Sequence, residues 1–133
     1  MKTTAKWIKN FQSIVDDGRG HEVKTDLPPA KGGEDTGTSA LELTLLSLSS
    51  CITTIFVMIA TKMHLTFEEL SVELEAENPD GMSIKSVEGL VKIKSGEPVE
   101  KLEKCLEKTE EMCPVGKIFE QASIPVKVKL LKV

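Results

Sequence analysis

The fold is decided by residues 39–63, which read SALELTLLSLSSCITTIFVMIATKM and form the longest apolar stretch of the chain. Ser39 has the side chain of a helix N-cap, and Glu42 three residues later completes a capping-box pattern. No charged residue occurs from Leu43 to Thr61. The stretch therefore predicts one long helix that begins near Ser39.

This helix has two competing interpretations. A membrane span needs about 20 predominantly apolar residues, and the stretch is long enough. However, several Ser and Thr side chains dilute it, and no aromatic belt flanks it. A helix that is apolar on most faces is also typical of the centre of a soluble domain. We therefore predict a long central buried helix and no membrane association.

The region before the helix predicts short strands followed by a loop. Residues 3–26 have extended patterns on either side of the turn Asp16-Asp17-Gly18-Arg19-Gly20. This is typical of an antiparallel hairpin or meander with Arg19 near a turn. Residues 27–38 contain two prolines and three glycines. A loop of this length in a compact domain is usually functional or wraps a partner.

The region after the helix predicts strands, then helices, then a strand. The expected elements are a half-exposed strand at 69–76, a turn at 78–81, a second strand at 84–94, helices at 97–112 and 113–122, and a last strand at 124–133. This order predicts an α+β fold, with an antiparallel sheet covered by helices on one side. At 133 residues, we expect a single domain spanning 1–133.

Composition excludes several classes of function. The net charge is −4 without a basic stripe, which argues against nucleic-acid binding. The start of the chain lacks the apolar segment of a secretory signal, so we expect a cytoplasmic protein with reduced thiols. His21 and His64 pair with no cysteine at zinc-ligand spacing. Neither a metal nor a cofactor is expected.

The three cysteines differ in their sequence contexts. Cys51 lies within the long helix, where it is either an inert core side chain or a nucleophile. Cys113 precedes Pro114, so it occupies an N-cap position where free amides would stabilise a thiolate. The alternative is a helix-to-helix kink in which this cysteine is incidental. Cys105 lies off the charged face of its helix, which predicts core packing.

Three segments together resemble the OsmC/Ohr family, named for osmotically inducible protein C and the organic hydroperoxide resistance protein. The first is Gly37–Leu43, followed by a Leu/Ser-rich helix that reaches Ser50-Cys51. The second is Cys113-Pro114-Val115, about sixty residues later. The third is Gly18-Arg19-Gly20 in the N-terminal hairpin. With the order of elements, the resemblance covers nearly the whole chain.

The resemblance implies an OsmC-like intertwined homodimer with active sites at the subunit interface. It implies that Cys51 reduces an organic hydroperoxide and that Cys113 resolves the sulfenic acid to a disulfide. A dithiol reductant, with lipoyl-type dithiols among the candidates, would reopen that disulfide. Arg19 would hold the Cys51 thiolate, and Glu42 would be the supporting acid.

The residue chemistry agrees with these roles. A buried thiolate needs a cation to offset its desolvation, and Arg stays charged with fixed donors. A second thiol traps a sulfenic acid before over-oxidation. An apolar rim of Ile55, Phe56 and Met58 would favour organic peroxides over hydrogen peroxide.

One position departs from the hydroperoxide-resistance pattern. That branch carries a Pro-Glu pair whose glutamate precedes the cysteine by ten residues, where this chain has Ala40 and Leu41. Glu42 is one place later, about 180° from Cys51 on a continuous helix. Leu41-Glu42-Leu43 instead resembles a less characterised OsmC-like branch. A second hypothesis therefore stays open: a non-catalytic dimeric module that binds a small apolar ligand at the subunit interface.

Overall fold

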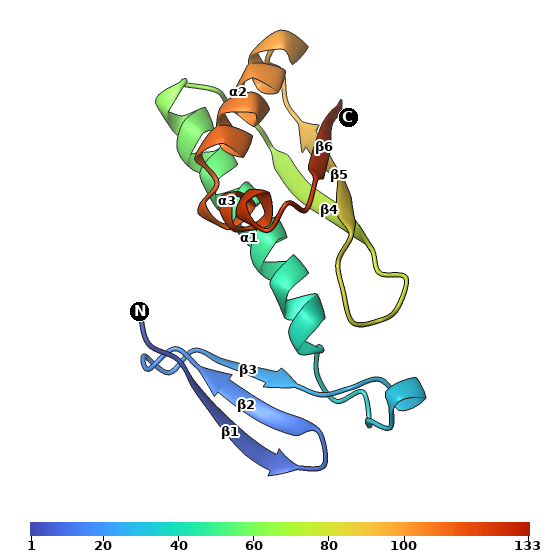
Figure 1. The fold of residues 1–133 in the computed structure, drawn as a ribbon. Coiled ribbons are helices and arrows are strands. Elements are labelled where there is room, and N and C mark those ends of the chain that lie inside the picture. The colour runs from blue at the N-terminus through green and yellow to red at the C-terminus, as the bar shows by residue number, and fades with distance from the viewer. The chain divides into compact units, whose positions relative to one another are not determined.

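A computed structural model describes all 133 residues, which fall into two compact units, Met1–Thr44 and Leu45–Val133. Helix α1 contributes residues to both units. The elements are β1 (Thr4–Lys9), β2 (Gln12–Asp16), β3 (Glu22–Thr25), the short 3-10 helix η1 (Pro29–Lys31), α1 (Ala40–Lys62), β4 (Glu69–Glu77), β5 (Ser86–Lys94), α2 (Val99–Met112), α3 (Pro114–Gln121) and β6 (Val126–Lys132) (Figure 1).

The first unit contains an antiparallel sheet in the order β1-β2-β3, as the sequence predicts. The turn between β2 and β3 closes because Asp16 and Asp17 accept backbone hydrogen bonds from Gly18 and Arg19. Gly18 and Gly20 have φ of 79° and 86°, which glycine adopts without a steric penalty.

Asp26 organises the loop that follows β3. Its buried carboxylate accepts hydrogen bonds from the amides of Leu27, Glu34 and Thr36 and from the Thr36 hydroxyl. Burial alone would raise the pKa of Asp26, but these hydrogen bonds outweigh it and hold the pKa below its usual value. The loop is therefore built around one buried charge that its own backbone satisfies.

Helix α1 begins with the capping box that the sequence predicts. The amide of Ser39 donates to the Glu42 carboxylate over 2.8 Å, and the amide of Glu42 donates to the Ser39 hydroxyl over 3.2 Å. Hydroxyls inside the helix bond to carbonyls of the preceding turn, as Thr53 does to Ser49. The Thr side chains are thus compatible with a helix in apolar surroundings.

The prediction that α1 is buried on most faces is wrong for the single chain. Its length and composition would suit a membrane span, yet it packs one stripe into the core of a domain. The buried residues are Leu48, Ile52, Phe56, Ile59 and Ala60. Leu46 and Met58, on other faces, are about half exposed. One three-stranded sheet and two short helices are too small to cover every face of a 23-residue helix.

The second unit contains a sheet in the order β4-β5-β6. β4 and β5 pair antiparallel over their full length, from Glu69 opposite Lys94 to Glu77 opposite Ser86. β6 runs parallel to β5, so the predicted purely antiparallel sheet is wrong at this strand. The reason is the connection: α2 and α3 carry the chain back across the sheet before β6 begins, which allows a parallel pairing.

The core of the second unit lies between the helices and this sheet (Figure 1). Side chains alternate between half-buried and exposed along β4 and β6, so one face of the sheet is covered and the other is open. Val91 and Ile93 of β5 meet the α1 stripe, and Leu102 and Leu106 of α2 complete the cluster. The α+β class predicted from the sequence is confirmed.

Candidate active site

Cys51 and Cys113 lie together in the second unit. Their Sγ atoms are 3.0 Å apart, although 62 residues separate them in the sequence. Helix α1 positions Cys51, and the junction between α2 and α3 positions Cys113. A disulfide has an S–S bond of about 2.05 Å, so a shift of about 1 Å would bond the two sulfurs. Both thiols are free.

Cys113 ends α2 and caps α3, as the sequence predicts. Its Sγ accepts a hydrogen bond from the Gly116 amide over 3.3 Å, and Pro114 is the first residue of α3. A side chain at Gly116 would place its Cβ 3.3 Å from the Cys113 Cβ, so glycine allows this close approach. The cap fixes the direction of the thiol towards Cys51.

The expectation of a stabilised thiolate at Cys113 is wrong. Burial of its side chain raises the pKa to about 11, and the hydrogen bond to Cys51 adds to the rise. The Gly116 amide acts in the opposite direction but is the weaker influence. Cys113 is only 1% exposed and is a protonated thiol at neutral pH.

The other two cysteines occupy different environments. Cys51 is partly exposed, whereas Cys105 is fully buried. The Cys105 thiol donates to the carbonyl of Phe56 over 3.7 Å, and burial raises its pKa. The predicted core role of Cys105 is confirmed.

Arg19 lies in the β2–β3 turn of the first unit, where its guanidinium binds Asp17. Its Nη2 and Nε are 2.7 and 2.9 Å from Asp17 Oδ2, and His21 Nδ1 is 2.8 Å from the same oxygen. The hydrogen bonds from His21 and then Arg19 lower the pKa of Asp17 to about 2. Cys51 belongs to the other unit, so its pairing with Arg19 stays a prediction.

Glu42 is occupied by its capping role. Its carboxylate accepts from the amide and hydroxyl of Ser39, and these two bonds lower the pKa of Glu42. It lies nine residues before Cys51 on the continuous helix α1. Its role as a supporting acid for Arg19 stays a prediction. Glu34, in the loop before α1, forms an ion pair with Lys9, with 3.1 Å between Lys9 Nζ and Glu34 Oε2.

One of the three residues predicted to form an apolar rim, Phe56, does not reach the surface. Phe56 is fully buried and packs edge-on against Phe67, with the ring centroids 6.4 Å apart. Ile55 is half-buried and Met58 is 48% exposed. Only Ile55 and Met58 can therefore contribute to a rim, because Phe56 belongs to the core stripe.

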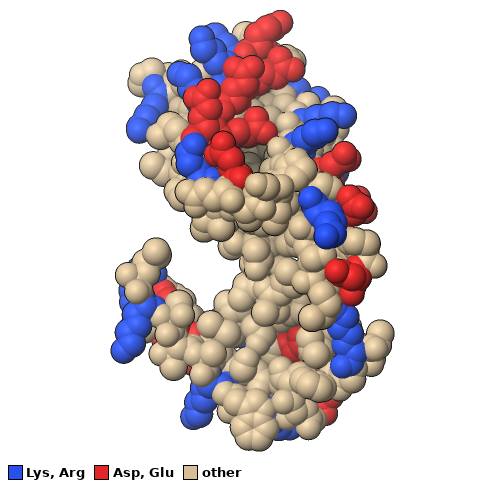
Figure 2. Space-filling view, viewed as in Figure 1, with Lys and Arg blue, Asp and Glu red and all other residues tan.

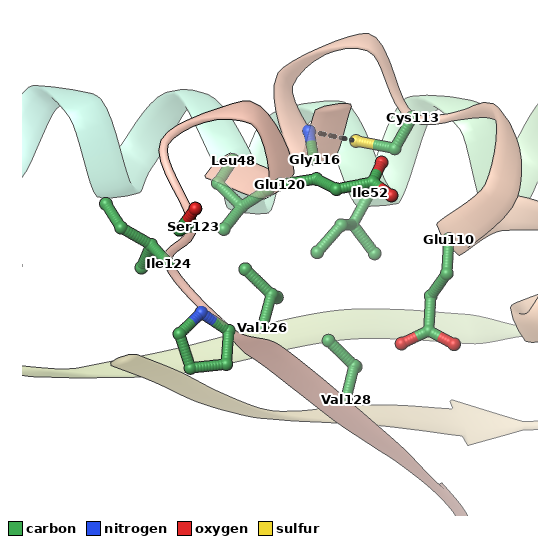
Figure 3. Close-up of a pocket in the computed structure, with 11 residues that line it drawn as sticks. Leu48, Ile52, Glu110, Cys113, Gly116, Glu120, Ser123, Ile124, Val126 and Val128 are labelled. Atoms are coloured by element: carbon green, nitrogen blue, oxygen red, sulfur yellow. Dashed lines mark hydrogen bonds between the residues drawn. The ribbon is translucent and has the colours of Figure 1, made fainter. Parts of the chain in front are cut away.

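A cavity of about 550 Å³ adjoins Cys113, and the sequence did not reveal it. Figure 3 shows Leu48 and Ile52 of α1 facing Val126 and Val128 of β6 across this space. The remaining lining residues are Glu110, Cys113, Gly116, Glu120, Ser123, Ile124 and Pro125. The cavity depends on how β6 packs against α1, which no local sequence pattern records. No group of three or more His, Cys, Asp or Glu side chains is arranged to hold a metal ion.

Comparisons with known proteins agree on the fold. A family model described as OsmC-like protein matches residues 32–129. No curated protein sequence matches. The solved OsmC-like protein from Mycoplasma pneumoniae is similar, with a TM-score of 0.85 at 15% identity, covering 99% of this chain and 96% of that one.

Two solved structures named for hydroperoxide resistance are also similar. The organic hydroperoxide resistance protein OsmC from Legionella pneumophila has a TM-score of 0.75 at 20% identity, covering 100% of this chain and 98% of that one. OhrB of Bacillus subtilis has a TM-score of 0.68 at 20% identity, covering 98% and 96%. At identities this low, the structural similarity shows the shared fold alone. The family model, however, matches most of the chain. The protein therefore belongs to the OsmC-like family.

Proposed function

We propose that this protein reduces organic hydroperoxides with a pair of cysteines. The observation that supports the proposal is the 3.0 Å separation of the Cys51 and Cys113 sulfurs, one partly exposed and the other buried. Family members named for hydroperoxide resistance have the same fold. A partly exposed sulfur can meet a substrate, and a buried one beside it can complete the reaction.

In the first step, the Cys51 thiolate attacks one oxygen of the hydroperoxide. The O–O bond breaks, the alcohol leaves with a proton, and Cys51 becomes a sulfenic acid. Arg19 is the proposed partner of the anionic sulfur, as the family resemblance implies. Cys113 is less suited to this step because its raised pKa keeps it protonated, and the thiol is a poor nucleophile.

In the second step, the Cys113 sulfur attacks the sulfenic acid. A Cys51–Cys113 disulfide forms, and the hydroxyl of the sulfenic acid leaves as water with the thiol proton. The short distance favours this step over further oxidation. A dithiol then reduces the disulfide, so each cycle oxidises one dithiol and reduces one peroxide. Because the reaction needs reduced thiols, we place the protein in the cytoplasm.

A homodimer is part of the proposal. Trp7 is 70% exposed, Phe11 is 54% exposed, and both lie in the first unit. Leu46 and Met58 expose about half of their surface on α1. Large exposed apolar side chains on several elements are typical of a surface that a partner covers. Sedimentation of a concentration-independent monomer would contradict the intertwined homodimer.

A second candidate function is non-catalytic binding of a small apolar ligand at the subunit interface. The observation that favours it is the capping role of Glu42, which leaves Arg19 with Asp17 as its acidic partner in the first unit. In this case the paired cysteines would be retained without peroxide turnover.

The test is consumption of cumene hydroperoxide with dithiothreitol as reductant. Wild type, Cys51→Ser and Cys105→Ser are compared, with Cys105→Ser as the matched control that also loses one thiol. We expect turnover in wild type and in the control, and none in Cys51→Ser. Inactive, folded and reduced wild type would favour the ligand-binding function.

A further inference from the structure

The cavity beside Cys113 touches only one of the two paired sulfurs. Cys113 and Gly116, the residue that donates to its Sγ, are part of the lining, and Cys51 is not. In Figure 3 the Cys113 side chain lies at the upper edge of the space, above Ile52. The two cysteines therefore have different surroundings. Cys51 is partly exposed on α1, whereas Cys113 lies next to this cavity.

The size and walls of the cavity suit an aliphatic chain. Its volume of about 550 Å³ lies within the range of small-molecule sites. Leu48 and Ile52 form one wall, and Val126 and Val128 form the opposite one. Such walls gain free energy by covering methylene groups and offer few partners to a polar molecule.

Two carboxylates are the only charged side chains in the lining. Glu110 comes from α2 and Glu120 from α3. Acidic side chains gather over α2 in Figure 2, on a face where the surface is hollowed. Lys117 lies 3.8 Å from Glu120 and offsets part of its charge, whereas no cationic side chain lines the cavity beside Glu110. An anionic molecule is thus disfavoured here.

We infer that this cavity admits the reducing dithiol, which attacks Cys113 of the oxidised pair, and that Glu110 and Glu120 select an uncharged or cationic aliphatic dithiol over an anionic one. The inference rests on the proposed function, since it concerns the reductive half of that cycle.

The reaction balances as two thiol–disulfide exchanges. One thiolate of the reductant attacks Cys113 Sγ, the bond between Cys113 and Cys51 breaks, and Cys51 leaves with the electron pair. The second sulfur of the reductant then attacks the first, which releases Cys113 and closes the reductant disulfide. The dithiol loses two electrons, and its two protons end on the protein cysteines.

The direction of attack follows from the leaving group. Attack on Cys51 would expel Cys113 into apolar surroundings, where burial disfavours its charged form. Attack on Cys113 expels Cys51, the more exposed sulfur. Cys113 leaves only in the second exchange, when the second sulfur of the reductant displaces it.

The experiment separates reduction from peroxide chemistry. The Cys51–Cys113 disulfide is made with diamide, and its reduction by dihydrolipoamide is followed in a stopped-flow instrument. Val128→Phe fills the cavity, and Leu131→Phe, on the same strand outside the lining, is the control. We expect reduction to slow at least about tenfold in Val128→Phe only, while oxidation by cumene hydroperoxide keeps its wild-type rate.

Equal rates in Val128→Phe and wild type would overturn the inference and leave the proposed function intact. If cumene hydroperoxide does not oxidise the wild-type protein, the proposed function is wrong. The two outcomes can be told apart because the disulfide made with diamide is reduced in a separate experiment that needs no peroxide. A second readout uses 2-mercaptoethanol, a monothiol, to reduce the same disulfide. The reaction is quenched with N-ethylmaleimide, and peptide mapping then locates the mixed disulfide. The mixed disulfide is expected on Cys113, and its presence on Cys51 would contradict the inference.

Charge selection is tested with a matched pair of reductants. Wild type should be reduced faster by neutral dihydrolipoamide than by anionic dihydrolipoate at low ionic strength. The ratio should fall by about fivefold in Glu110→Gln, the size expected for one nearby unit charge. Glu100→Gln, on the same helix but outside the lining, should keep the wild-type ratio. An unchanged ratio in Glu110→Gln would exclude its role in selection, even if Val128→Phe does not fold.

Discussion

The Sγ atoms of Cys51 and Cys113 are 3.0 Å apart, yet Cys113 is only 1% exposed whereas Cys51 is partly exposed. In the proposed mechanism, this asymmetry divides the chemistry between the two sulfurs. The partly exposed Cys51 meets the peroxide, and the buried Cys113 reacts only with Cys51 or with a molecule in the adjoining cavity.

Replacing Cys113 by Ser should stop the reaction after one oxidation. The hydroxyl cannot form a disulfide, so the Cys51 sulfenic acid should persist and then advance to sulfinic acid. Mass spectrometry of the Cys51 peptide after one and after ten equivalents of cumene hydroperoxide measures both species. If the Cys113→Ser variant still forms an intramolecular disulfide, with Cys105 as the partner, the resolving role is wrong.

The raised pKa of Cys113 predicts a loss of stability in alkali. The folded chain keeps this proton up to about pH 11, whereas an unfolded thiol loses it near pH 9. Stability from this group is therefore complete below pH 9 and is lost as the pH rises towards 11. Urea unfolding between pH 8 and 11 should show a steeper decline in wild type than in Cys113→Ala. Equal slopes would contradict the raised pKa.

Alkylation kinetics give an independent check on the same thiol. In Cys51→Ala the hydrogen bond that Cys113 donates to Cys51 is removed, but burial, the larger cause of the raised pKa, remains. The rate at which iodoacetamide modifies Cys113 should therefore still rise at pH values above 9. A plateau reached near neutral pH would mean that the cap of α3 stabilises a thiolate after all.

The capping box predicts different results for its two members. Ser39→Ala should lower the free energy of unfolding by about 1 kcal/mol, because the amide of Glu42 loses its acceptor. Glu42→Gln keeps an acceptor for the Ser39 amide but loses the negative charge, so it should lower the free energy of unfolding by less than Ser39→Ala does. The lowered pKa of Glu42 means that its charged contribution is present above pH 4.5 and is lost as the pH falls further.

Glu42→Gln also tests the predicted catalytic role. If Glu42 only caps α1, peroxide turnover should match wild type at pH 7. A large fall in the rate constant for peroxide, without a large fall in stability, would show that the carboxylate supports Arg19 in catalysis.

Arg19→Ala should slow oxidation of Cys51 by at least about tenfold, since a cation that stabilises the anionic sulfur is removed. Lys24→Ala, in the neighbouring strand β3, removes a positive charge elsewhere and is the control. Stopped-flow oxidation with cumene hydroperoxide measures both. Equal rates in the two variants would leave Arg19 as a turn residue that binds Asp17.

Local patterns in the sequence predicted much of the fold. The Ser39–Glu42 cap, the aspartate turn before β3 and the start of α3 at Cys113 depend on residues within a few positions of one another. Turns and caps are decided by backbone groups nearby in the chain, so their residue types identify them. The residues around Cys51 and around Cys113 likewise indicate the family from the sequence alone.

The tertiary structure decided what depends on distant segments. It brought Cys51 to Cys113 across 62 residues, set β6 parallel to β5, and buried only one stripe of α1. It also reversed the expected ionisation of Cys113: the N-cap amide is present, but burial outweighs it. Helix caps are local and can be recognised from sequence, whereas desolvation is set by everything that packs around an atom and emerges only from the folded chain.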